Sequence, residues 1–254
     1  MLLEVAPDLV ALLVLAGFVA GFVDSIAGGG GLITVPALLL AGADPVTALA
    51  TNKLQGLFGA GAAAFSYARA GQVDLRSQRA GVIAAFAAAI CGSLLASSLP
   101  TDVIRIGLPV VLIGIAVFFA VKPGLDDHDR AARMRPATFM LTVAPLITFY
   151  DGLIGPGTGS FLMLGFVTLA GFGVLRATAH SKLLNFASNV GSLVAFAVVA
   201  APWWLTGLAM GAAQVAGAAL GARLAVRVGA RLIKPLLVVT SGVLALRLLW
   251  DVWA

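Results

Sequence analysis

The sequence DSIAGGGGLITVP occupies residues 24–36 and interrupts an otherwise apolar stretch that runs from residue 9 to residue 41. A second stretch, DGLIGPGTGS at residues 151–160, interrupts the apolar run from residue 137 to residue 170. Glycine and proline at this density break a helix, because glycine has a high conformational entropy when unfolded and proline lacks the amide donor. Each run is therefore predicted to form two shorter helical pieces, separated at the aspartate and the glycines by unwound backbone.

The two interruptions belong to a longer internal repeat. Asp24 aligns with Asp151 at an offset of 127 residues, and ATNKL at 50–54 aligns with AHSKL at 179–183 at an offset of 129. The offset of 129 persists further along, where Gly92 matches Gly221 and Arg105 matches Lys234. The chain is therefore predicted to consist of a first transmembrane repeat at 1–121, a linker at 122–136 and a second transmembrane repeat at 137–254.

The composition is that of an integral membrane protein. Of the 254 residues, 61% are hydrophobic and only 11% are charged, and the mean hydropathy is +1.06. Soluble domains carry about 25% charged residues, and a soluble protein of this size cannot hide so much apolar surface from water. The formal charge of +5 is better explained by basic cytoplasmic loops than by nucleic-acid binding.

Six continuous apolar stretches are long enough to cross a bilayer, which requires roughly 20 mostly apolar residues. They are 46–68, 80–99, 103–121, 174–200, 203–226 and 232–249. With the two interrupted runs, hydropathy predicts about eight transmembrane segments in an all-α membrane protein. The first apolar segment lacks a basic start and is expected to remain in the mature protein.

Loop charge distinguishes two topologies. If each interrupted run crosses the membrane fully, the basic loops of the two halves fall on opposite sides, against the tendency of Lys and Arg to be cytoplasmic. If each run is instead a re-entrant hairpin, 12 of the 16 Lys and Arg residues lie on the cytoplasmic side. We therefore expect two inverted repeats, each a broken helical hairpin followed by three transmembrane helices, although a bent full crossing at 9–41 stays open.

The glycine-rich interruptions are the first candidate binding site. Irregular backbone survives in a membrane only where it is buried in protein or lines a cavity, and free N–H groups at helix starts attract anions. The alternative is close helix packing through small residues. The residues predicted to surround an anion are Gly28, Gly29, Gly30, Gly31, Gly157, Thr158, Gly159 and Ser160.

Polar residues near the starts of two long helices are the second candidate. Lys53 and Lys182 are repeat-related cations, which suits an anionic substrate, and buried ionisable residues in membrane spans are usually functional. In the alternative, both lysines reach to the membrane interface. The neighbouring residues predicted to supply neutral hydrogen bonds are Asn52, Gln55, Ser181 and Asn185.

Asp24, Asp151 and His180 are candidates for proton coupling, because burial raises the pKa of a carboxyl group and histidine titrates near neutral pH. The aspartates can equally be structural partners of the two lysines or cap the following turns. The sequence contains no HExxH pair, no paired-cysteine metal site and no Walker A motif. We therefore expect a protein that is not an enzyme and that has no cofactor and no metal.

Four motifs in order resemble the sulfite exporter TauE/SafE family. They are DSIAGGGGLITVP at 24–36, ATNK at 50–53, GPGTGS at 155–160 and AHSKLLN at 179–185. The resemblance covers nearly the whole chain. It implies a bacterial plasma-membrane transporter of sulfur-containing anions such as sulfite or sulfonates, or of related organic anions.

The expected function is secondary transport of a small anion, with export, proton coupling and alternating access between the halves. The expected partners are the anionic substrate, protons and the lipid bilayer, with no nucleic acid, and a homodimer is an open alternative. Two rival functions remain: a passive anion channel that uses the same site, and a membrane accessory protein or enzyme without transport activity.

Overall fold

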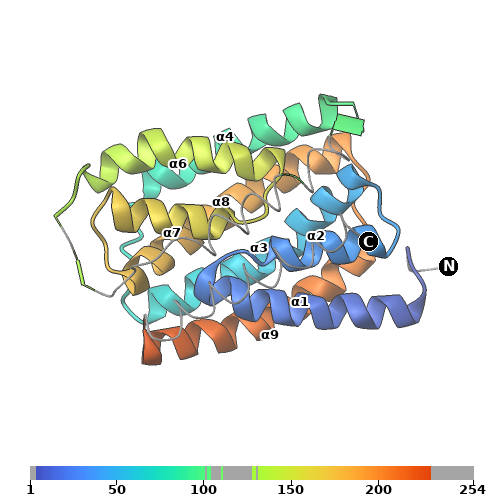
Figure 1. Ribbon diagram of the computed structural model, residues 1–254, viewed down its shortest axis with the longest axis horizontal. Helices are drawn as coiled ribbons and strands as arrows, with labels where there is room; N and C mark the ends of the chain where they lie inside the picture. The colour runs from blue at the N-terminus through green and yellow to red at the C-terminus, as the bar shows by residue number, and fades with distance from the viewer. Residues whose placement is uncertain (1–3, 101, 104–109, 111–127, 130, 230–254) are drawn as a thin grey trace.

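The computed structural model describes residues 4–100, 102–103, 110, 128–129 and 131–229 (Figure 1). Within these residues the chain is helical throughout and contains no strand. The helices are α1 (Pro7–Ala27), α2 (Gly31–Leu40), α3 (Pro45–Arg69), α4 (Arg79–Ser98), α6 (Pro136–Leu153), α7 (Thr158–Thr168), α8 (Val174–Val199) and α9 (Trp204–Val228). The spans predicted at 103–121 and 232–249 lie almost wholly outside the described residues, as do most of the linker at 122–136, Arg105 and Lys234.

Local sequence explains where several helices begin. Proline opens α1, α3 and α6, where its fixed φ suits the first turn and its missing donor costs nothing. The carboxylate of Asp44 caps α3 by accepting hydrogen bonds from the backbone N–H groups of Val46 and Thr47, both at 3.1 Å. The start of α9 is capped by Glu4, which accepts from the N–H groups of Leu205 and Thr206.

Both interrupted runs are broken, as predicted, but the breaks begin later than expected. Asp24 and Asp151 lie inside the last turns of α1 and α6, and the unwound backbone starts only at Gly28 and at Ile154. The prediction that the aspartates belong to the unwound backbone was wrong, because helical hydrogen bonding continues past a single aspartate and ends only at Gly28 and Ile154. As a result α1 has 21 residues and α6 has 18, whereas α2 and α7 have 10 and 11.

In the described part of the chain, four helices are long and apolar enough to cross a membrane: α1, α4, α8 and α9. The predicted spans at 80–99, 174–200 and 203–226 correspond to α4, α8 and α9 within two residues at each end. The predicted span at 46–68 forms α3, which has 25 residues but is less apolar than these four helices. Most of its polar side chains, among them Asn52 and Lys53, are buried within the protein.

Each broken run folds back on itself. At the start of α1, Leu9 and Val10 pack with Leu38, near the end of α2. Just before α6, the N–H group of Met134 donates to the carbonyl oxygen of Leu169, just after α7, at 2.9 Å. The outer ends of each helix pair therefore lie together, and the two breaks point into the protein.

The helices pack most closely where glycine faces a neighbouring backbone. Helix α1 packs against α9, α4 packs against α6, and α3 and α8 lie between these pairs (Figure 1). A Cβ at Gly217 would lie 2.1 Å from the carbonyl oxygen of Phe18, and a Cβ at Gly92 would lie 2.0 Å from that of Phe149. Any larger residue at either position forces the helices apart, as expected for packing through small residues in a bilayer.

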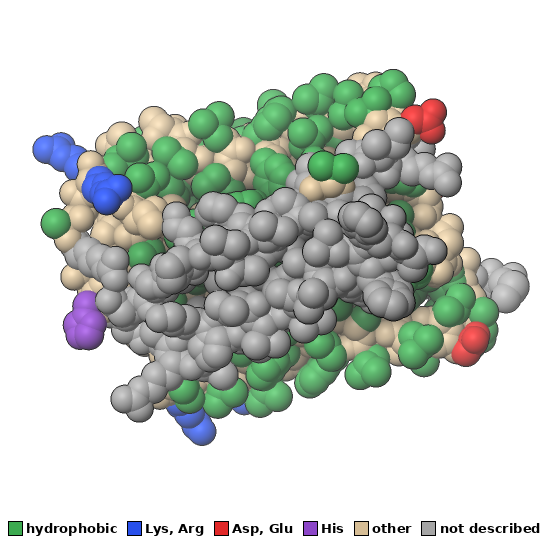
Figure 2. Space-filling model, in the orientation of Figure 1, with side chains coloured by type: hydrophobic (Ala, Val, Ile, Leu, Met, Phe, Trp, Pro, Cys, Tyr) green, Lys and Arg blue, Asp and Glu red, His purple; other side chains and the backbone are tan. Residues whose placement is uncertain are grey.

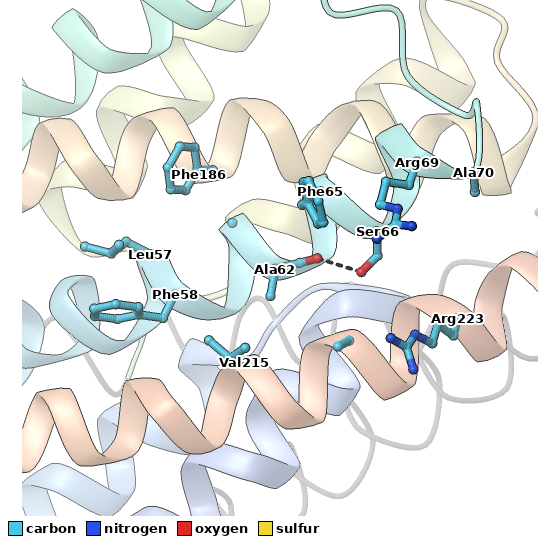
Figure 3. Close-up of a pocket in the computed structure, with 12 residues that line it drawn as sticks. Leu57, Phe58, Ala62, Phe65, Ser66, Arg69, Ala70, Phe186, Val215 and Arg223 are labelled. Carbon is cyan, nitrogen blue, oxygen red and sulfur yellow. Dashed lines mark hydrogen bonds between the residues drawn. The ribbon is translucent and has the colours of Figure 1, made fainter.

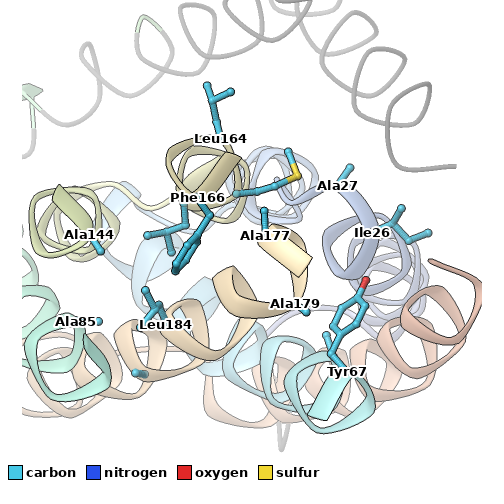
Figure 4. Packing of buried hydrophobic residues seen from close by; sticks show 14 of the residues in the cluster. Ile26, Ala27, Tyr67, Ala85, Ala144, Leu164, Phe166, Ala177, Ala179 and Leu184 are labelled. Carbon is cyan, nitrogen blue, oxygen red and sulfur yellow. The ribbon is translucent and has the colours of Figure 1, made fainter. Parts of the chain in front are cut away.

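The core and the surface agree with a membrane setting. Figure 4 shows buried apolar residues such as Phe166 and Leu184 between the helices, with Tyr67 pointing its hydroxyl group toward α1, where it donates to the carbonyl oxygen of Ser25 at 2.8 Å. Large apolar side chains such as Ile83 and Leu146 are exposed on the outside. On the face shown in Figure 2, Lys and Arg side chains lie at one end and Asp and Glu side chains at the other.

Candidate functional site

The two breaks meet inside the protein. The hydroxyl group of Ser160 in α7 donates to the carbonyl oxygen of Ala27 at the end of α1, at 2.8 Å. A Cβ at Gly28 would lie 2.4 Å from the backbone nitrogen of Ser160, so only glycine fits there. On the other side, a Cβ at Gly31 would lie 3.2 Å from the Cα of Pro156. Segments 24–31 and 151–160, separated in sequence, therefore form one unit.

Glycine is required at the breaks for a second reason. Gly28 and Gly29 have φ angles of +81° and +85°, and Gly155 and Gly157 have +97° and +86°. Residues with a Cβ rarely adopt these angles, because the Cβ clashes with the backbone. These turns redirect the chain so that α2 and α7 begin beside each other.

A small polar cavity lies between the breaks. Its free volume is about 30 Å³. A water molecule requires about 10–15 Å³, so the cavity can hold water but little else. It is lined by residues of both breaks and of α3, α8 and α9: Asp24, Gly29, Gly30, Gly31, Asn52, Gln55, Gly56, Asp151, Gly155, Gly157, Thr158, Gly159, Asn185, Asn189 and Gln214. Most of the residues predicted to bind an anion therefore border one space.

Backbone N–H groups at this cavity favour the binding of an anion. The N–H groups of Gly29 and Gly157 make no hydrogen bond within the part of the chain that the structure describes. The first N–H groups of any helix also lack intrahelical partners, and both α2 and α7 start at the cavity. Two positive helix-dipole ends thus point at one place, an arrangement that favours a negatively charged group.

Two buried ion pairs cross between the halves of the chain. The Nζ of Lys53 lies 2.7 Å from Oδ1 of Asp151, and the Nζ of Lys182 lies 2.8 Å from Oδ2 of Asp24. The two lysines are 1% and 0% exposed, so neither reaches to the membrane interface. Among the roles that the sequence left open for the aspartates, both residues are found as partners of the lysines.

The two pairs differ in their surroundings. Asp24 is 16% exposed, and its Oδ1 accepts a hydrogen bond from the N–H group of Gly30 at 3.0 Å. Asp151 is 2% exposed, and its Oδ2 accepts from the hydroxyl group of Ser188 at 2.5 Å. The pair of Asp24 is therefore the more accessible of the two.

Neutral side chains form a network on the opposite wall. The amide oxygen of Asn52 accepts from the hydroxyl group of Thr34 at 2.6 Å and from Nε2 of Gln55 at 2.8 Å. Nε2 of Gln214, in α9, donates to Oε1 of Gln55. This network holds Asn52 and Gln55 in fixed orientations at the cavity.

Sequence reasoning missed Thr34, Gly56, Ser188 and Gln214 as members of the site. The available signal was weak but present for one of them, because Gln214 is a strongly polar residue in the middle of an otherwise apolar helix. Ser188 and Thr34 also bond to carbonyl oxygens of their own helices, a common arrangement for hydroxyl groups in helices, so their roles depend on three-dimensional contacts.

Three hydroxyl groups that were predicted to be donors to the anion bond to the backbone instead. The hydroxyl groups of Thr158 and Ser160 donate to the carbonyl oxygens of Gly155 and Ala27, and that of Ser181 donates to a carbonyl within α8. These hydroxyl groups stabilise the backbone, because a buried hydroxyl without a partner is costly. Thr158 contributes its position to the lining, but the predicted hydroxyl donors are engaged elsewhere.

His180 lies apart from the aspartates. Its Nδ1 forms a hydrogen bond with Nε2 of Gln78, and the residue lines a separate cavity of about 330 Å³ together with Asp74 and Arg176. It stands at the end of the molecule that carries the α3–α4 loop. The structure therefore separates it from the central site.

The chain closely resembles known membrane transporters. The family model described as sulfite exporter TauE/SafE matches residues 13–248. A Sinorhizobium protein named "Probable membrane transporter protein ORF9" is 55% identical over 98% of this chain and 95% of its own length. The Escherichia coli K12 protein named "Probable membrane transporter protein YfcA" is 43% identical over 98% of this chain and 93% of its own length, and a Haemophilus influenzae protein of similar name is 41% identical over 98% of both. No solved structure matches.

Proposed function

Since the chain belongs to the sulfite exporter TauE/SafE family and is a membrane transporter, not an enzyme, we propose that it exports small sulfur-containing or organic anions, such as sulfite or sulfonates, across the plasma membrane. One observation carries this proposal: two helix starts and the aspartates of two lysine–aspartate ion pairs border a single small polar cavity. The family is described as sulfite exporters, which supports both the sulfur oxyanion and the outward direction.

The cavity offers three kinds of donor to an oxyanion. The free N–H groups of Gly29 and Gly157 bind oxygen atoms directly, and the amide side chains of Asn52 and Asn185 supply further donors. The third donor is the ammonium group of Lys182, which packs against Gly159, where a Cβ would lie 2.9 Å from its Nζ. An oxyanion such as sulfite has three oxygen atoms that accept such bonds at once.

The ion pairs link anion binding to protons. Two lysines and two aspartates sum to no net charge, so a bound anion adds an unbalanced negative charge in a region of low dielectric, which is costly. A proton on Asp24 removes that charge and frees Lys182 to bind the anion. The proton and the anion therefore bind together, and outward flow requires the substrate to accumulate inside the cell.

The cavity supports alternating access over an open pore. A volume of about 30 Å³ admits one water molecule but not a sulfonate, so the cavity has to widen before such an anion can bind. The anion enters only when helices move apart on one side. Transporters of this kind commonly place the substrate between two structural repeats and rock one against the other.

We propose that the two repeats are inverted and together make eight transmembrane segments. The outer ends of the α1–α2 hairpin lie beside Trp203, at the start of α9. Those of the α6–α7 hairpin lie beside Arg176, at the start of α8, because Pro136 and Arg176 line one cavity. Arg176 is near the first residue of α8 and Trp203 follows shortly after its last residue, so the two hairpins contact opposite ends of this helix. Helix α8 has 26 residues and is about 39 Å long. The hairpins therefore open in opposite directions.

Flux in proteoliposomes tests the proposal. Purified protein is reconstituted with sulfite, sulfoacetate, acetate or chloride inside, and efflux is measured with and without a pH gradient. The double variant Asp24→Asn with Lys182→Met removes one ion pair without leaving a buried charge, and we expect it to abolish anion efflux while the protein stays folded. Ser181→Ala is the matched control, since its hydroxyl group bonds only within α8, and we expect unchanged efflux.

Three outcomes would contradict the proposal. Wild-type efflux of none of these anions would exclude the substrate class. Normal efflux by the double variant would exclude a role for Lys182. Flux that ignores pH and never accumulates an anion against its gradient would identify a passive channel.

A further inference from the structure

A groove runs along the outer face of the protein, away from the central cavity. Its walls come from α3, α8 and α9, and its volume is about 720 Å³ (Figure 3). The lining is apolar over most of its length and includes Leu57, Phe58, Phe65, Phe186 and Val215. Phe65 is 64% exposed and Val215 is 40% exposed, so these side chains face outward.

One end of the groove is basic. Arg69, in the last turn of α3, and Arg223, in α9, both border it and are both exposed (Figure 3). The guanidinium carbon of Arg69 lies 5.7 Å from the centre of the Phe65 ring, within the range of a cation–π interaction. This contact holds the cation at the mouth of the groove.

The length of the groove matches half of a bilayer. Twelve residues separate Leu57 from Arg69 along α3, which corresponds to about 18 Å of helix. One leaflet of the hydrocarbon core is about 15 Å thick. An acyl chain that starts at the arginines therefore ends near Leu57.

We propose that this groove binds an anionic phospholipid, with one acyl chain along the apolar walls and the phosphate group between Arg69 and Arg223. Arg69 ends α3 and Arg223 lies near the end of α9, and these helix ends lie at the side of the molecule where Figure 2 shows basic side chains. The positive-inside rule assigns this side to the cytoplasmic leaflet. Anionic headgroups and guanidinium groups meet at that depth. The lipid contacts both α3 and α9, and α3 also carries Asn52 and Gln55, which border the central cavity.

A second copy of the chain is the less suitable occupant. A two-fold axis along the membrane normal would place one groove opposite an identical groove, and two concave surfaces leave an unfilled space between them. The same axis would bring four arginines to one depth without a counterion. A phosphate group neutralises this charge, and an acyl chain fills the space.

Native mass spectrometry of the detergent-purified protein measures the binding directly. The probes are dioleoyl phosphatidylglycerol and dioleoyl phosphatidylcholine, which share acyl chains and differ in charge. We expect the wild-type protein to retain the anionic lipid about 30-fold more strongly, since two arginine contacts are each worth roughly 1 kcal/mol near the surface and about 1.4 kcal/mol corresponds to a tenfold change. Arg69→Gln with Arg223→Gln should reduce this to the phosphatidylcholine level.

Two further variants separate the groove from general attraction. Arg76→Gln with Arg227→Gln removes two exposed charges outside the groove, and lipid retention should not change. Ala219→Phe fills the apolar part of the groove while keeping both arginines, and it should weaken retention of both lipids.

Other outcomes overturn the proposal. An equal loss in both double-arginine variants would mean general charge attraction. Thermal stabilisation by inorganic phosphate alone, equal to that by the lipid, would mean an anion site without a lipid. Disulfide cross-linking of Val215→Cys between copies in a Cys91→Ala background, unchanged by added phosphatidylglycerol, would assign the groove to a dimer interface.

Discussion

Replacing Lys53 with methionine tests the more deeply buried ion pair. The pair spans 2.7 Å and its partners are 1% and 2% exposed, so the substitution leaves the buried carboxylate of Asp151 without its ammonium partner. Removal of one partner from a buried pair costs about 3–5 kcal/mol, because the remaining charge is uncompensated. For a chain of this size that free energy corresponds to a melting temperature lower by about 6–20 °C.

A double variant that replaces both Lys53 and Asp151 provides the comparison for the single variant. Lys53→Met with Asp151→Leu replaces the pair with apolar side chains, and we expect stability within about 1–2 kcal/mol of the wild type. Ser188 keeps a partner in this variant, because its hydroxyl group also donates to the carbonyl oxygen of Asn185 at 2.9 Å. The difference between single and double variants measures the coupling between Lys53 and Asp151.

The assay is thermal unfolding in detergent, followed by intrinsic fluorescence. Arg176→Met is the matched control, because its ion pair with Asp129 is about half exposed and should contribute at most about 1 kcal/mol. A single variant at Lys53 that melts with the wild type would refute the buried pair. Equal destabilisation in the single and double variants would show that the two residues do not act as a pair.

Three further predictions follow from the site and the packing. If proton and anion bind together, apparent anion affinity should fall up to tenfold for each unit rise in pH, and Asp24→Asn should remove this dependence in a binding titration. Gly155→Ala places a Cβ 2.6 Å from a lysine ammonium nitrogen at a φ of +97°, and should lower stability by about 1–3 kcal/mol and abolish efflux. Partial burial raises the pKa of Glu4, but hydrogen bonds from the start of α9 outweigh it and lower this pKa below its usual 4.5. The stability that Glu4 contributes is therefore present above pH 4.5 and is lost as the pH falls further. In an unfolding series at different pH values, Glu4→Gln should reduce this loss.

Local signals in the sequence were sufficient for the helices and the breaks. Runs of apolar residues marked α4, α8 and α9, and clustered glycines marked the two interruptions. These features depend on neighbouring residues in the chain and on the thickness of the bilayer, so they could be predicted without knowledge of tertiary contacts. The internal repeat then placed Lys53 and Lys182 in equivalent positions.

The roles of individual polar groups could not be read in the same way. The sequence left the lysines free to face the interface and offered the hydroxyl groups of Thr158 and Ser160 as anion donors. In the structure both hydroxyl groups donate to backbone carbonyl oxygens at the breaks. Which acceptor a hydroxyl group finds depends on the path of the backbone, because any unpaired carbonyl within reach competes for it.

Sequence alone established a polytopic helical protein with two glycine-rich breaks and a set of buried polar residues. Tertiary structure decided that Lys53 meets Asp151 across 98 residues and that Lys182 meets Asp24 across 158. Periodicity and composition describe how one segment partitions between lipid and protein. A buried charge, however, is stable only beside an opposite charge, and the identity of that partner is determined when distant helices pack together.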